Sequence, residues 1–123
     1  MANEAGTSMS EKAADKTDVL QGTLDLMVLQ TLETMGPQHG YGIAARLEQV
    51  SSGALQLNMG TLYPALMRLE QRGLVRGKWG TTETNRKARY YDLTAAGRRQ
   101  LAKEKQAWDQ MAGIIHALLH GKA

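Results

Sequence analysis

The apolar positions in the first part of the chain follow a helical period. Leu24, Val28 and Leu32 recur at steps of four, and further leucines occupy an adjoining face. Apolar side chains on two faces predict a helix over residues 20–35 that is buried on both sides. Gly36–Pro37 is expected to end it, because glycine accepts left-handed dihedral angles and proline cannot continue a helix. So much apolar surface in a small domain also suggests a partner chain.

Two shorter helices are predicted next. Residues 41–50 have a helical apolar pattern, and residues 39–42, HGYG, form the entrance to this second helix. The third helix has Leu62, Leu66 and Leu69 on its inward side, and Gly73 supplies its stop.

The third helix contains Pro64, which lacks the backbone donor that a helix interior uses. If Asn58 is the N-cap, Pro64 falls in the second turn and costs one backbone hydrogen bond. If the helix starts near Gly60 or Thr61, Pro64 falls in the first turn, where the missing N–H costs little. We expect the second arrangement.

The period changes after Gly73. Residues 74–79 (LVRGKW) and 88–93 (ARYYDL) are short β-like runs, joined by a polar, turn-rich segment, and they predict a hairpin with a basic tip. Thr94 is expected to cap a last helix that runs to about Leu119. Its apolar stripe has near-heptad spacing and no obvious cover within the chain, which is typical of a dimerisation helix.

Composition and charge exclude some classes of function and favour others. The chain of 123 residues has no cysteine, which excludes disulfides and thiolate metal sites, and no apolar run long enough for a membrane span. The N-terminus lacks the layout of a signal peptide, so a cytoplasmic location, associated with the nucleoid when bound to DNA, is expected. Residues 1–50 carry three cationic and seven acidic side chains, whereas residues 68–105 carry eleven and four. A basic half favours a polyanion such as nucleic acid, although a solvated charged face would show the same charges.

These elements predict a mainly α fold with a small β-hairpin: a winged helix-turn-helix over residues 18–93 and a dimerisation helix over residues 94–119. Residues 1–17 are polar and aperiodic and are predicted to be a disordered tail. The third helix presents Thr61, Pro64, Arg68 and Gln71 opposite its leucines. A hydroxyl, a compact ring, a guanidinium and an amide suit base edges and phosphates in a major groove.

Several ordered motifs together resemble the PadR family of bacterial transcriptional regulators. The resemblance covers roughly residues 18–119 and implies a winged helix that dimerises through its last helix. It also implies operator binding, usually repression, that a small molecule often relieves. The motifs are HGYGI (39–43), GTLYPAL (60–66), RLE (68–70), GLV (73–75) and RYYDLTAAG (89–97).

We therefore predict a sequence-specific DNA-binding regulator, a repressor that acts as a homodimer on a pseudo-palindromic operator in double-stranded DNA. For the two residues at the entrance of the second helix, phosphate contact and capping or packing are equally good explanations. The predicted DNA-binding residues are His39, Tyr41, Asn58, Gly60, Thr61, Tyr63, Pro64, Arg68, Lys78, Arg86 and Lys87.

The predicted dimer interface comprises Leu24, Val28, Leu101, Trp108, Met111, Ile115 and Leu118. In the multidrug-binding branch of the family, a tryptophan on the last helix stacks on flat aromatic ligands. Trp108 is therefore a candidate for binding a small aromatic effector, although a role in the dimer core is favoured for it. Trp79 is expected to pack within the hairpin.

An enzyme is not expected, because no nucleophile lies near a base and the carboxylates are scattered. No cofactor is predicted, and no metal site, since His39 has no second ligand at a useful spacing. The main alternative is a winged helix used for protein–protein contact without sequence-specific DNA binding.

Overall fold

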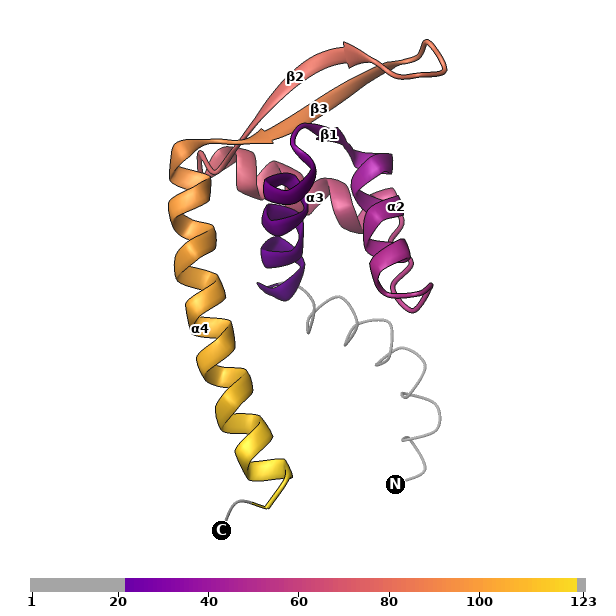
Figure 1. Cartoon of the computed structure of the whole chain (residues 1–123). Coiled ribbons are helices and arrows are strands. Elements are labelled where there is room, and N and C mark those ends of the chain that lie inside the picture. The colour runs from indigo at the N-terminus through magenta and orange to yellow at the C-terminus, as the bar shows by residue number, and fades with distance from the viewer. Residues whose placement is uncertain (1–21, 122–123) are drawn as a thin grey trace, which may run out of the picture.

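The computed structural model describes residues 22–121, so the predicted tail and the predicted start of the first helix lie outside the described residues. The described chain is mainly helical and contains one small sheet (Figure 1). Its elements are a first helix over residues 22–35, β1 (Gln38–His39), α2 (Gly40–Val50), α3 (Met59–Gln71), β2 (Val75–Thr81), β3 (Lys87–Leu93) and α4 (Ala95–Leu119).

The winged helix-turn-helix fold is confirmed: three helices precede a long β2–β3 hairpin, the wing. One strand was not predicted. The two residues of β1 pair with β3, which gives an antiparallel sheet of order β1-β3-β2. Two residues are too few to show an alternating pattern, so no signal in the sequence marks this strand.

The predicted start of the third helix is wrong. α3 begins at Met59, and the Asn58 side chain accepts a hydrogen bond from the Thr61 N–H at 2.9 Å. The Asn58 carbonyl also accepts from the N–H groups of Thr61 and Leu62. Pro64 therefore lies in the second turn, where it leaves the carbonyl four residues earlier without its helical donor. The complete cap at Asn58 compensates for that loss.

One apolar core lies between the first helix, α2, α3 and the base of the wing. The leucines predicted to face inward on α3 are all fully buried. Three residues assigned to a dimer interface also belong to this core: Leu24, Val28 and Leu101 are only 3%, 0% and 4% exposed. We correct that assignment, because side chains already covered by their own chain have no surface left for a partner.

α3, the wing and α4 meet at a tight junction. Gly73 ends α3 with a φ of +75°, and the Thr94 hydroxyl donates to its carbonyl at 2.6 Å. The Thr94 N–H donates to the Leu74 carbonyl, and the Thr94 hydroxyl accepts from the N–H of Gly97. A Cβ at Gly97 would lie 2.0 Å from the Leu74 carbonyl oxygen. Only a residue without a side chain lets α4 approach so closely.

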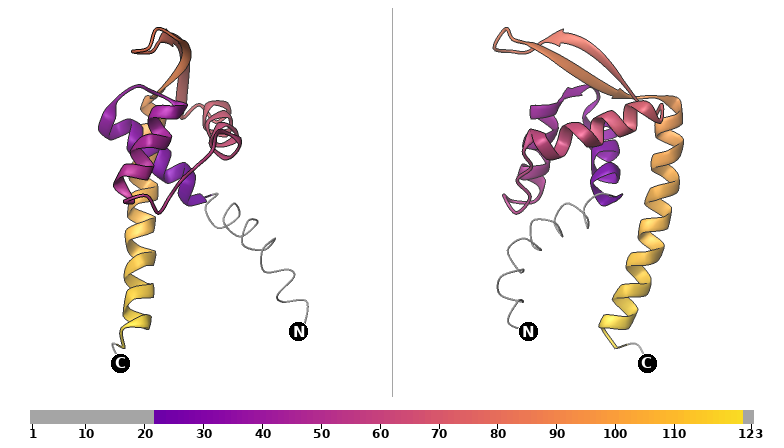
Figure 2. Two further views of the ribbon diagram at one scale, coloured as in Figure 1. Left: turned by 90° about the vertical axis from the view of Figure 1, so that its right-hand side faces the viewer. Right: turned by 180° about the vertical axis from the view of Figure 1, so that it is seen from behind.

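Beyond the junction, α4 leaves the body of the protein, as Figures 1 and 2 show. Leu101 is its last buried residue, so the helix continues for five turns with little cover from the rest of the described chain. Large apolar side chains on this arm are exposed: Trp108, Met111, Ile114, Ile115, Leu118 and Leu119.

The junction predicts a strong effect of Gly97→Ala. The added methyl group collides with backbone, which cannot rotate away, so we expect the free energy of unfolding to fall by about 1–3 kcal/mol. Gly113→Ala is the matched control, because it lies on the same helix with nothing near its Cβ position. That variant should be neutral or stabilised by up to about 1 kcal/mol. Urea unfolding at one protein concentration measures both, and equal stabilities would contradict the role of the junction.

Candidate nucleic-acid interface

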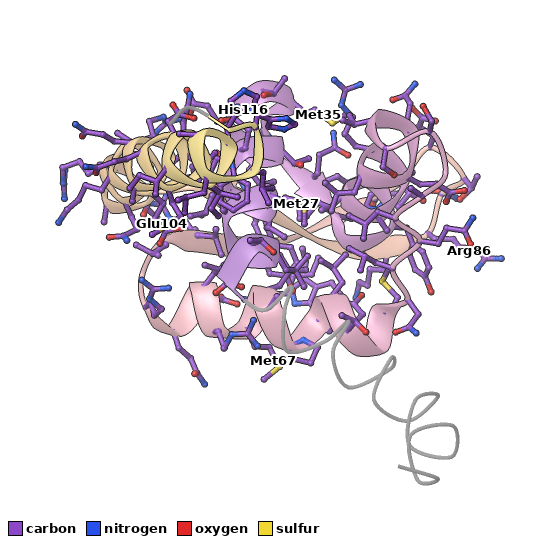
Figure 3. All side chains as sticks on the ribbon, turned by 90° about the horizontal axis from the view of Figure 1, so that it is seen from below. Met27, Met35, Met67, Arg86, Glu104 and His116 are labelled. Atoms are coloured by element: carbon purple, nitrogen blue, oxygen red, sulfur yellow. The ribbon has the colours of Figure 1, made fainter. Side chains whose placement is uncertain are left out.

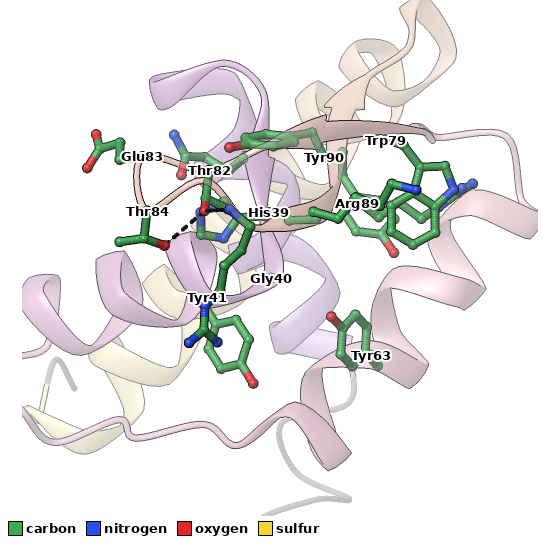
Figure 4. A pocket seen from close by; sticks show the side chains of 15 residues that line it. His39, Gly40, Tyr41, Tyr63, Trp79, Thr82, Glu83, Thr84, Arg89 and Tyr90 are labelled. Carbon is green, nitrogen blue, oxygen red and sulfur yellow. Dashed lines mark hydrogen bonds between the residues drawn. The ribbon is translucent and has the colours of Figure 1, made fainter.

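A groove of about 1200 Å³ lies between the wing and the first turns of α2 and α3 (Figure 4). Five of the predicted DNA-binding residues line it: His39, Tyr41, Tyr63, Arg86 and Lys87. Its other aromatic and cationic lining residues are Trp79, Arg89, Tyr90 and Tyr91. The mixture of exposed rings and cations suits contact with sugars and phosphates.

His39 caps α2. Its Nδ1 accepts a hydrogen bond from the Gly42 N–H at 3.0 Å, so in the neutral ring Nε2 is the protonated nitrogen. The imidazole also meets the ring of Tyr90 edge-on, with 5.2 Å between centroids. Of the two explanations left open for His39, capping is therefore the one observed. A phosphate contact would have to use Nε2.

The start of α2 lies close to the start of α3. A Cβ at Gly40 would lie 3.3 Å from the Met59 sulfur and 3.7 Å from the ring of Tyr63, so glycine allows this contact. Tyr63 remains 41% exposed and Tyr41 69% exposed. Both tyrosines therefore present ring and hydroxyl to the groove from two different helices (Figure 4).

Arg89 joins the wing to α3. Its guanidinium forms an ion pair of 2.6 Å with Glu70 and lies about 6 Å from the ring centroids of Trp79 and Tyr91. The hydrogen bond that Arg89 donates to Glu70 raises the pKa of Arg89, and burial raises the pKa of Tyr91, so both groups keep their protons at neutral pH. The ion pair holds β3 against the outer edge of α3.

Trp79 is more exposed than predicted. It lies against its cross-strand partner Arg89 within the hairpin, but it is 62% exposed and also lines the groove. A second residue without a predicted role is Met67, which is 57% exposed and lies one turn from Pro64 and Gln71 on the outward face of α3. No pattern in the sequence distinguishes these two from buried apolar residues.

The remaining predicted DNA-binding residues lie outside the groove. Gly60, Thr61 and Pro64 occupy the first two turns of α3 and are exposed or half-buried, while Asn58 is engaged as the N-cap. Lys78 is exposed on β2 but does not line the groove.

Arg68 is not a free cation on the surface of α3. Its Nη2 donates to Asp25 Oδ1 of the first helix at 2.9 Å, with side-chain exposures of 35% and 13%. Burial raises the pKa of Asp25, although the hydrogen bond and the charge of Arg68 act in the opposite direction. No local pattern indicates this pair, because 43 residues separate its partners.

Removing Arg68 and removing Asp25 should lower the free energy of unfolding by different amounts. Arg68→Ala leaves a nearly buried carboxylate without a partner, so we expect a loss of about 1–3 kcal/mol in the free energy of unfolding at pH 7. Asp25→Asn should cost less, because the partly exposed guanidinium can turn to water.

The pH dependence follows from the raised pKa of Asp25. Above that pKa the folded state holds the ionised carboxylate, so the cost of Arg68→Ala is complete at neutral pH. It shrinks as the pH falls through the folded pKa, because protonation removes the unpaired charge. Urea unfolding from pH 7 down to pH 4 measures this, and a cost that does not depend on pH would contradict the explanation.

Comparison with known proteins agrees with this geometry. A model of the transcriptional regulator PadR-like family matches residues 28–103. A PadR-like transcriptional regulator from Bacillus cereus has 26% identity and a TM-score of 0.73, with 85% of this chain and 99% of that chain covered. A transcriptional regulator from Clostridium thermocellum has 27% identity and a TM-score of 0.72, with coverage of 80% and 95%.

One sequence relative differs in length. An uncharacterized 37.1 kDa protein of a Streptomyces fradiae transposon is 42% identical over 80 residues. The match covers 65% of this chain but only 21% of that protein.

Among residues 22–121, no group of three or more histidine and acidic side chains is placed to hold a metal ion. Within the same range no helix is both long and apolar enough to cross a bilayer.

Proposed function

Because the chain belongs to the PadR-like family of transcriptional regulators, we propose that it is a repressor that binds a pseudo-palindromic operator as a homodimer. Membership of a transcriptional regulator family supports DNA binding and favours a regulator over an enzyme. The observation that carries the proposal is the groove that joins the tip of the wing to the starts of α2 and α3.

In this proposal, the first two turns of α3 enter the major groove. Thr61 and Pro64 face base edges, and Gln71 and Met67 extend the same exposed face. Pro64 presents a compact ring, which allows close approach of the backbone. Arg68 contributes to specificity only if DNA draws it from Asp25, so it is a weaker candidate than its position on the helix suggested.

The wing and α2 position the protein on the backbone. Arg86 and Lys87 are exposed at the tip, where they neutralise phosphates or enter the minor groove. His39 Nε2 and the Tyr41 hydroxyl add donors on the same side of the groove. Asn58 has an indirect role in this proposal, because its side chain caps α3 and so fixes where that helix begins.

The proposal predicts that Arg86→Ala with Lys87→Ala weakens binding to operator and random DNA alike. Each lost phosphate contact should reduce the slope of log K against log salt by about 0.9. Lys103→Ala with Lys105→Ala removes the same charge from exposed positions on α4 and serves as control. Fluorescence anisotropy at several salt concentrations measures all three proteins. Equal slopes for both double variants would argue against the wing as the DNA contact.

The identity of the operator is best found by selecting bound fragments from genomic DNA. Enrichment of a two-fold symmetric sequence, with half-sites about one helical turn apart, is expected for two recognition helices in a dimer. If no sequence were enriched, the protein–protein module would become the better explanation.

The dimer is supported by the exposed apolar stripe of α4. Trp108, Met111, Ile115 and Leu118 recur at steps of three and four, and each is about half exposed or more. Such a stripe on a protruding helix suits pairing with a second copy. An aromatic effector at Trp108 would depend on this pairing, because Trp108 does not line the groove of the single chain.

Light scattering tests the dimer. The wild-type protein should have twice the chain mass of 13.5 kDa at micromolar concentration. Ile115→Glu places a charge in the stripe and should shift the mass toward that of one chain, while Gln110→Glu, away from the stripe, should not. A wild-type mass of one chain would refute the dimer.

A further inference from the structure

Two histidines lie side by side at the end of α4. His116 and His120 have ring centroids 4.4 Å apart and ring planes tilted by 37°. Both residues are exposed, and His116 is labelled at the helix end in Figure 3. The backbone fixes their spacing, because the His120 N–H donates to the His116 carbonyl at 2.9 Å. The proposed DNA interface assigns no role to this pair.

We propose that His116 and His120 chelate a late first-row transition-metal ion, of which Zn²⁺ and Ni²⁺ are examples. Residues four apart lie on one face of a helix, and this histidine spacing is the one that helical zinc sites use. With metal–nitrogen bonds of about 2.0–2.1 Å, two neighbouring imidazole ligands have centroids about 4.5 Å apart in an octahedral site and about 5.2 Å apart in a tetrahedral one. The observed separation needs only a small rotation of the rings.

The end of the helix itself favours a cation, because the C-terminal end of a helix carries partial negative charge. The charged side chains of residues 106–123 are Asp109, two turns before His116, and Lys122, two residues after His120, so their charges cancel. Selectivity therefore comes from the ligands, because imidazole prefers zinc, nickel or copper, whereas magnesium and calcium prefer oxygen.

The pair is separate from the other surfaces of α4. At 100° per residue, His116 and His120 lie on the side of the helix opposite Met111, Ile115 and Leu118. The end of α4 is also remote from the wing (Figure 1). The metal site therefore does not rest on the proposed dimer or on the proposed DNA contacts. Two protein ligands leave the other coordination positions open to water or to a further ligand.

The chain has few side chains that could compete with this pair for a transition metal. The chain has three histidines and no cysteine, and the third, His39, uses Nδ1 to cap α2. The probe is Zn²⁺, followed by Ni²⁺, titrated into the tag-free full chain by calorimetry at about pH 8, where imidazole is neutral. The matched control exchanges two residues, His120→Ala with Ala117→His, which keeps the composition but places the histidines on different faces.

We expect one ion per chain for the wild-type protein and at least tenfold weaker binding for the exchanged variant and for His116→Gln. Circular dichroism shows whether the variants keep their helix content. Hydrogen exchange at the end of α4 should slow when the ion binds. Equal affinity in the wild-type and exchanged proteins, absence of saturable binding, or one ion per two chains would each overturn a chelate within one helix.

Discussion

The contact of Gly97 with the Leu74 carbonyl sets the geometry of the molecule. At this point the end of α3, the base of the wing and the start of α4 come within hydrogen-bond distance of one another, and Thr94 bonds to both Gly73 and Leu74. The direction of α4 relative to α3 follows from this packing. In a dimer built through α4, the same contact would fix the spacing of the two recognition helices.

The first helix contacts both α3 and α4. It is buried among α2 and α3 through its leucines. It also forms one ion pair with α3, between Asp25 and Arg68, and one with α4, between Glu33 and Arg98 at 3.4 Å. The second pair is half exposed and contributes little energy. The first is nearly buried on its acidic side, so DNA that recruits Arg68 must also compensate Asp25. Specificity through Arg68 therefore carries a cost that the exposed residues Thr61 and Pro64 avoid.

The surface of α4 is divided between two faces: its apolar stripe suits a second chain, whereas the histidine pair lies on the other side. Trp79 on the wing and Tyr63 on α3 are both exposed to the groove. Large exposed rings near cations fit a surface that meets DNA sugars and phosphates better than one that faces water.

The sequence by itself determined the helices, the hairpin and the caps at Thr94 and Gly73, because periodicity and capping are local. It also carried the motifs that identified the family. Only the tertiary structure decided which apolar residues are covered by their own chain, and so removed Leu24, Val28 and Leu101 from the interface. It alone paired Arg68 with Asp25 and exposed Trp79, because those outcomes depend on contacts between residues far apart in the chain.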